Sequence, residues 1–504
     1  MKRLAKIACL SLTVVCLLAP ATTRAQEEDR VDLSLDQCLR MALESNLQLV
    51  SARYNPDIAE TDIMANRANF DLGLDIEATH FELEDAPIGS FSVSSFKQDE
   101  EKITLSQPLK FGSNYSAEFF SKKEDRGGAQ ISVPTQIESG LRLNFTQPLL
   151  RGFGTSVATE QLVLARNNAT VSRHDLETTA GLIIEEVEGA YWNVVAAREA
   201  LRIERLSLKR AQELLDQNRR KVEVGSMAPL EITQAEAGVA SQEENVIVSE
   251  TTLIDAEDEL RRLMGVPAVD PMWNKSIYNL DAPQFRTREV DLDEAIATAL
   301  RERSEIHSRR QTLRNRELSE KVARRQLRNQ LDLILNYEPA SSSATVPMLG
   351  LTADFGDSIE GILDGDEYQW FARVSYRMTF GNRAAKATFA RNTLSREQSE
   401  VDLADQEQTI RVEVRKAVRG VESGIKRVEA ATSNVVLQRR KLDAEQKKYE
   451  NGMSTSFEVL TFQSDLATAE LGEVRARLDY IRSLASLERV KGTLLASRGL
   501  SLAE

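Results

Sequence analysis

The residue types that carry enzyme chemistry are few in this chain and poorly placed for it. The three histidines, His80, His174 and His307, are scattered, and no two stand at the spacing of a metal site. Residues 354–356 spell the Asp-Phe-Gly triplet of kinases, but neither a glycine-rich loop nor a catalytic loop accompanies it. The sequence has no Gly-x-Ser-x-Gly motif and no Walker A loop. We therefore expect no catalytic residue, no cofactor, no metal centre and no enzyme activity.

The N-terminal segment and the charge limit the compartment and the partners. Residues 1–25 carry four basic residues, no acidic residue and an apolar run, and are typical of a secretory signal peptide cleaved after Ala25. The remaining chain has 60 basic against 78 acidic residues. This excess of acid argues against a nucleic-acid partner.

The exported chain has few ways to be anchored. Cys38 is the only cysteine left after cleavage, so disulfides are not expected. No stretch of 18 or more consecutive apolar residues follows the signal peptide. The remaining destinations are the periplasm, the medium, or the outer membrane as a β-barrel.

The mature chain is an internal duplication. Residues 35–43 return as residues 292–300, each with apolar side chains on one face of a short helix. This predicts a first structural repeat over residues 26–280 and a second over residues 281–504. The first is longer by about 30 residues.

Strand periodicity follows the opening helices of each repeat. Apolar and polar residues alternate over about 70–83 and 137–150 in the first repeat, and over about 330–338 and 368–380 in the second. The extra residues of the first repeat contain two more alternating runs, which predict an additional hairpin over about 101–122. Stretches of about ten residues fit strands that cross a bilayer.

A long helical hairpin ends each repeat. Residues 155–264 and 383–497 have helical periodicity, and each first helix runs for roughly 65 residues without proline, or roughly 100 Å at 1.5 Å per residue. Gly225 and Gly452 interrupt these segments where a helix end requires positive φ. We expect two antiparallel hairpins with tips at these glycines.

The order of these elements resembles the TolC-like outer-membrane efflux protein family, the outer membrane factors. The resemblance covers essentially the whole mature chain and is carried by the opening helices and the two tip motifs, together with Gln147-Pro148-Leu149-Leu150-Arg151-Gly152-Phe153-Gly154, Ala190-Tyr191-Trp192 and Phe380-Gly381-Asn382-Arg383.

The resemblance implies an α+β membrane protein. Family members form a homotrimer that closes one outer-membrane β-barrel with about four strands per chain, continued by a long periplasmic α-helical barrel. Such a protein is the passive exit channel of a tripartite efflux or type I secretion system. Its partners are a periplasmic adaptor (membrane fusion protein) and an inner-membrane pump of RND or ABC type. The extra hairpin departs from the four-strand pattern.

In this family the helical tips dock on the adaptor. The tip motifs place this role on eight residues: Gly225, Ser226, Pro229, Leu230, Gly452, Met453, Ser454 and Phe457. The alternative is that they only end helices. Apolar residues at the turns favour docking, because a bare turn would be polar.

The family also narrows its periplasmic aperture with an acidic ring just before the second tip. Asp443 matches that place, nine residues before Gly452, and would contribute three carboxylates in a trimer. A basic run, residues 439–441, precedes it where a second acid is expected. A solvated helix face is the alternative.

Aromatic residues near the strand ends suggest a membrane girdle, formed by Tyr337, Trp370, Phe371 and Tyr376. The alternative is the core of a soluble sheet.

For the whole chain, the competing function is a periplasmic adaptor or coiled-coil scaffold, which would also have a signal peptide and long hairpins. The transported substrate and the class of pump stay open.

Overall fold

The computed structural model describes residues 30–84, 93, 95–128, 130–281, 285, 287–365 and 367–502. The predicted signal peptide lies outside these residues. The chain divides into two compact units. A sheet unit comprises Ser51–Thr179 and Asp293–Glu413, and a helical unit comprises Met1–Val50, Ala180–Leu292 and Val414–Glu504.

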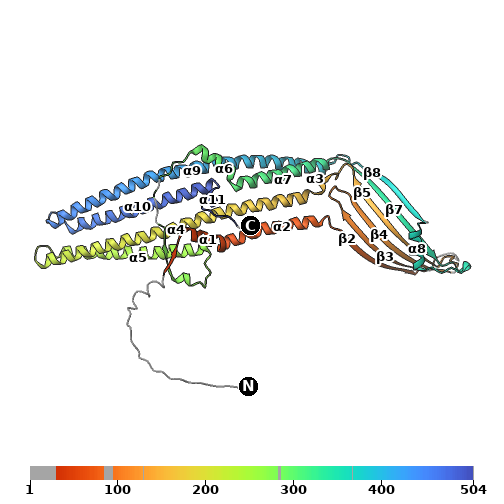
Figure 1. The fold of residues 1–504 in the computed structure, drawn as a ribbon, viewed down its shortest axis with the longest axis horizontal. Helices are drawn as coiled ribbons and strands as arrows, with labels where there is room; N and C mark the ends of the chain where they lie inside the picture. Colours follow the sequence, from red (N-terminus) through yellow and green to blue (C-terminus); the bar gives the residue numbers. More distant parts are fainter. Residues whose placement is uncertain are drawn as a thin grey trace, which may run out of the picture. The chain divides into compact units, whose positions relative to one another are not determined.

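The sheet unit is built on six antiparallel strands in the order β2-β3-β4-β5-β7-β8 (Figure 1). Their bounds are β2 (Gly73–Glu84), β3 (Ser95–Pro108), β4 (Asn114–Gly127), β5 (Thr135–Pro148), β7 (Gln330–Ala344) and β8 (Tyr368–Arg377). The helices of this unit are α2 (Leu47–Ala68), which starts in the helical unit, α3 (Thr155–Ala158), α6 (Leu292–Glu302), α7 (Ser304–Gln326) and α8 (Phe355–Asp364).

The extra hairpin is part of this sheet. β3 and β4 lie between β2 and β5, with Ile103 opposite Ile76 on one side and Phe119 on the other. The sheet of one chain therefore has six strands, four from the family pattern and two from the additional hairpin that the sequence predicted. The hairpin also extends beyond the predicted range, because the backbone pairing continues past the apolar alternation into polar residues 95–101 and 121–127.

Two long helices, α4 (Glu160–Glu223) and α9 (Arg383–Glu450), start in the sheet unit and end in the helical unit. α5 (Leu230–Met264) returns along α4, and α10 (Ser456–Val490) returns along α9. Ion pairs hold the first hairpin together, from Arg198–Glu257 at 2.8 Å to Arg219–Glu236 at 3.0 Å. The ion-pair partners on α5 have lower residue numbers as the residue numbers on α4 rise, so α4 and α5 are antiparallel. The second hairpin ends at Val490, before Gly492 at positive φ, rather than at residue 497.

The opening segment of the helical unit packs on the hairpins. α1 (Leu35–Ser45) begins with a capping box between Ser34 and Gln37 and buries Leu39 and Ala42. β1 (Arg30–Leu33) pairs in parallel with β6 (Ser276–Asn279), a two-stranded sheet that the periodicity did not predict. The last helix is α11 (Leu494–Ser497). Among the described residues, none of the helices has the length and hydrophobicity of a membrane-spanning helix.

Candidate functional site

The two tips share one backbone design. Gly225 has φ of +73° and Gly452 has φ of +75°. The amide of Ser226 donates to the Lys221 carbonyl at 2.9 Å, and the amide of Met453 donates to the Lys448 carbonyl at the same distance. These six-to-one bonds satisfy carbonyls at the helix ends and require a residue that tolerates positive φ.

The predicted docking residues lie together on the tips, and most are exposed. Leu230, Met453 and Phe457 have exposed apolar side chains, with 65–71% of each accessible. Ser454 is the exception, because its hydroxyl lies between two carboxylates, 2.6 Å from Glu445 and 2.7 Å from Glu458, and can donate its one hydrogen to either. The tips therefore present apolar groups to solvent where a plain turn would present polar ones.

A buried polar network joins the two tips. The Tyr449 hydroxyl donates to the side-chain oxygen Oδ1 of Asn218, and the side-chain amide Nδ2 of Asn218 donates to the Ser456 hydroxyl at 2.7 Å. The Asn218 amide also donates to the Glu231 carbonyl at 3.1 Å. The Lys221 ammonium lies 3.9 Å from the centre of the Tyr449 ring. The first hairpin is thus tied to the second just behind the exposed residues.

Sequence reasoning missed this network. The signal that could have found it is an asymmetry between the repeats, because Tyr449 occupies the place of Val222 in the matching motif. A large side chain with a polar end must find a partner when it is buried. Burial also raises the pKa of Tyr449, which keeps its hydroxyl a donor.

Asp443 is exposed on α9, next to the buried Leu442. The basic run before it is largely engaged with α10. Arg439 pairs with Glu470 at 2.8 Å, and the Lys441 ammonium lies 3.5 Å from Asp465. Pairing of these cations leaves the Asp443 carboxylate less compensated than the sequence implied. Its place in an acidic ring stays a prediction.

The sheet has one apolar face that continues across all six strands. Cross-strand neighbours align Leu105 with Ala117, Leu143 with Tyr337, and Tyr337 with Trp370. The apolar band consists of Leu74, Ile76, Ile103, Leu105, Tyr115, Ala117, Phe119, Leu141, Leu143, Phe145, Leu331, Leu333, Leu335, Tyr337, Trp370, Ala372, Val374 and Tyr376. A single apolar face of this extent suits contact with lipid.

Three of the four predicted girdle residues, Tyr337, Trp370 and Tyr376, lie on this band. Phe371 does not, because alternation places it opposite Asn336 on the other face. There the Arg373 guanidinium stacks 4.8 Å from its ring centre. Phe371 therefore lies off the apolar band, and the membrane girdle stays a prediction.

The opposite face of the sheet carries polar side chains that form ion pairs and hydrogen bonds between neighbouring strands. Arg142 donates to Glu338 at 2.7 Å and also pairs with Glu118. The Asn336 amide donates to Asn144 at 2.9 Å. Such hydrogen-bonded charges suit a wall that faces water.

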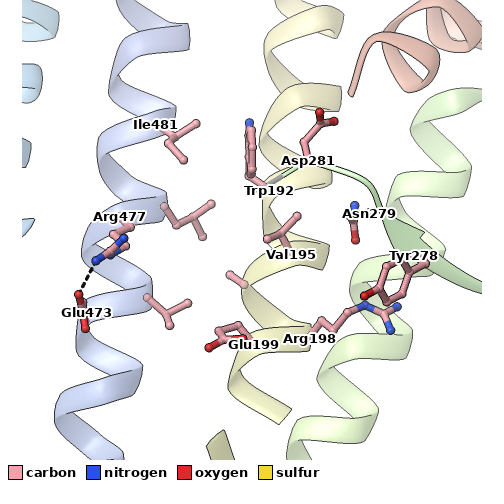
Figure 2. Close-up of a pocket in the computed structure, with 13 residues that line it drawn as sticks. Trp192, Val195, Arg198, Glu199, Tyr278, Asn279, Asp281, Glu473, Arg477 and Ile481 are labelled. Carbon is pink, nitrogen blue, oxygen red and sulfur yellow. Dashed lines mark hydrogen bonds and ion pairs between the residues drawn. The ribbon is translucent and has the colours of Figure 1, made fainter. Parts of the chain in front are cut away.

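Helices α4 and α10 flank a cavity of about 420 Å³ in the helical unit (Figure 2). Its charged lining is internally paired, with Arg477 donating to Glu473 at 2.6 Å and Arg198 donating to Glu257 at 2.8 Å. Arg198 also lies over the ring of Tyr278. The charges of Arg477, Glu473 and Arg198 are thus compensated by ion pairs.

Two of the histidines that appeared scattered are brought together. The rings of His174 and His307 stack 5.4 Å apart, and His174 contacts Glu177 at 3.1 Å. Within the described part of the chain, no group of three or more His, Cys, Asp or Glu residues is arranged to hold a metal ion.

An amphipathic six-stranded sheet and two long helical hairpins together define a class of outer-membrane channel protein. Residues 114–266 and 295–493 match the outer membrane efflux protein family, and the chain belongs to that family. Membership places the protein in the outer membrane, with a long periplasmic helical part.

Two curated relatives are similar over part of their length. The chain is 23% identical over 340 residues to the pyoverdine export outer membrane protein OpmQ of Pseudomonas putida. It is 24% identical over 339 residues to the outer membrane protein TolC of Salmonella enteritidis. The alignments cover 65% and 66% of this chain, and 65% of each relative.

Solved channels share the fold at low identity. The outer membrane channel CmeC of Campylobacter jejuni matches with a TM-score of 0.65 and 15% identity, over 93% of this chain and 87% of that one. CusC matches with a TM-score of 0.69 and 15% identity, over 92% of each chain.

Proposed function

We propose that this protein is the passive outer-membrane exit channel of a tripartite efflux or type I secretion system. In this proposal it assembles as a homotrimer that receives substrate from an inner-membrane pump of RND or ABC type through a periplasmic adaptor. The observation that carries the proposal is the sheet, which has one continuous apolar face and which, among the described residues, ends at β2 on one side and at β8 on the other.

The edges favour closure with further copies of the same chain. An open sheet edge in lipid would leave backbone groups without partners. Six antiparallel strands are an even number, so β2 and β8 run in opposite directions. When copies are related by rotation about a pore axis, β8 of one copy meets β2 of the next as an antiparallel pair. Three copies of this sheet give a barrel of 18 strands.

The faces fit the same arrangement. The apolar band would contact lipid, and the polar face with Arg142 and Glu338 would line the water-filled lumen. Glu338 and Asn336 on the polar face are largely buried, whereas Ile76 and Trp370 on the apolar face are exposed. This difference supports a concave polar face. The tips, with their exposed Leu230, Met453 and Phe457, are our candidate for the adaptor surface.

Electron microscopy of detergent-extracted protein tests the proposal. We expect a three-fold tube with 18 strands inside the detergent belt and helices beyond it. A water-soluble monomer or a rod without a detergent belt would refute it and favour the periplasmic adaptor or scaffold. A twelve-stranded trimer would retain the channel but contradict the inclusion of β3 and β4.

A further inference from the structure

The connection between β7 and β8 exposes several large apolar side chains. This connection contains a short 3-10 turn (Pro347–Leu349) and helix α8. Met348 is 95% exposed, Leu349 72% and Leu363 85%. These side chains have no place in the core of the sheet unit, so their exposure calls for another contact.

Helix α8 is fixed on the apolar side of the sheet. The Ser358 hydroxyl is fully buried and lies 2.9 Å from the Ser139 hydroxyl, which lies 3.0 Å from the Ser121 hydroxyl. Gly361 permits close approach, because a Cβ there would lie 2.1 Å from the Ser341 hydroxyl oxygen. Strand alternation puts these three strand serines on the same face as the apolar band.

The helix also lies at the edge of that band. Ser139 is two residues from Leu141, and Ser341 is four residues from Tyr337, so the contact between Ser139 and α8 lies about 7 Å along β5 from Leu141. The long helices join the strands at the opposite end of the sheet, as Figure 1 shows. α8 is therefore at the end of the strands that would face the outside of the cell.

The helix is itself two-sided. Phe355, Ile359 and Leu363 repeat every four residues along one flank, while Asp357 and Asp364 lie on the other. Phe355 lines a cavity of about 420 Å³ over β2 to β5, whose other apolar residues are Ala78 and Ile137 and whose charged or titratable residues are His80, Asp99, Glu100, Glu101 and Lys123. Ser358 and Gly361, which contact the strands, lie on a different side of the helix, so Leu363 on the apolar flank points away from the sheet and is exposed.

We infer that α8 and residues 347–351 form a membrane-surface anchor that lies in the outer leaflet at the boundary between headgroups and acyl chains. The occupant of this surface is lipid rather than a second copy, because α8 covers the inner strands β5 and β7 and not the edges at which copies would meet. Insertion of Met348, Leu349 and Leu363 continues the apolar band outward, while the acidic flank stays hydrated. This inference rests on the proposed function, since it requires the band to face lipid.

Spin labelling of the full-length trimer tests the anchor. Leu349→Cys and Leu363→Cys, carrying a nitroxide, are reconstituted into vesicles of phosphatidylethanolamine and phosphatidylglycerol. Collision rates are compared for oxygen, which concentrates in the acyl region, and for a water-soluble nickel chelate. Asp357→Cys is the control on the same helix, and Trp370→Cys is the reference for the apolar band. Both native side chains are largely exposed, so substitution should not disturb folding.

We expect oxygen-to-nickel ratios at positions 349 and 363 to approach that at position 370 and to exceed that at position 357 several-fold. Ratios at 349 and 363 equal to the control, with position 370 in lipid, would overturn the anchor alone. Access of nickel to position 370 would instead overturn the lipid-facing band and with it the proposed function.

Discussion

The hydroxyl of Tyr449 should control how firmly the two hairpin tips are held together. Tyr449→Phe removes the donor to Asn218 but keeps the ring, which remains in its apolar cluster beside Leu442 and under the Lys221 ammonium. The loss leaves a buried amide oxygen without that partner. A buried hydrogen bond of this kind contributes about 1 to 2 kcal/mol, which corresponds to a factor of about 5 to 30 in the opening equilibrium.

Hydrogen exchange measured by mass spectrometry on the intact protein provides the assay. Amides of residues 445–458 should exchange about 5 to 30 times faster in Tyr449→Phe than in the wild type. Asn218→Ala should have a larger effect, because it also removes the bonds to Ser456 and Glu231. The double variant should add little to Asn218→Ala, because the bond between Tyr449 and Asn218 is already lost. Tyr54→Phe on the exposed surface of α2 is the control and should change nothing at the tips.

The outcome bears on both structure and function. If the proposed channel opens by separating the hairpins, Tyr449→Phe should also raise the fraction of open channels in planar bilayers. Tip exchange rates within two-fold of the wild type would refute the reasoning. Fully additive effects of Tyr449→Phe and Asn218→Ala would show that the two side chains do not act together.

Three further predictions concern the second tip, the proposed aperture and the buried thiol. Gly452→Glu should abolish adaptor binding and export but leave the trimer intact. Gly499→Glu is the control, because Gly499 has a similar positive φ and open surroundings, and it should retain adaptor binding and export. Normal adaptor binding by Gly452→Glu would contradict the docking role. Asp443→Ala should change single-channel conductance and its block by divalent cations, whereas Asp216→Ala should not; unchanged block would remove Asp443 from the aperture. Burial raises the pKa of the Cys38 thiol to about 12, so a disulfide reagent at pH 8 should label the mature protein only after denaturation; rapid labelling of the native protein would contradict this. The free energy of unfolding should also decline as the pH rises above about 8.5, which is the ordinary thiol pKa in the unfolded chain.

The long hairpins could be read from the sequence because their signals are local. Helical periodicity, the scarcity of proline and the two tip glycines all act within a few residues, and both glycines have the positive φ that their position suggested. The apolar alternation likewise marked the strands wherever one face is apolar and the other polar.

Features that depend on distant partners could not be read in this way. The outer halves of β3 and β4 carry charges on both faces, as in Lys97 opposite Asp125, so only backbone pairing reveals them as strands. α8 could not be read from the sequence because it is only 10 residues long, and its contact with Ser139 joins residues 219 positions apart. The Tyr449 network spans 231 positions in the same way.

The place of the insertion explains how this sheet could grow without losing the ability to close. Adding a hairpin keeps the number of strands even, so β2 and β8 still run in opposite directions. A single added strand would make the edges parallel and would prevent antiparallel pairing between rotated copies. With strands about 4.8 Å apart and tilted about 40°, an 18-stranded barrel has a backbone radius of roughly 18 Å, against roughly 12 Å for twelve strands. The insertion therefore widens the proposed exit by about half while leaving untouched the helical hairpins that would receive the substrate.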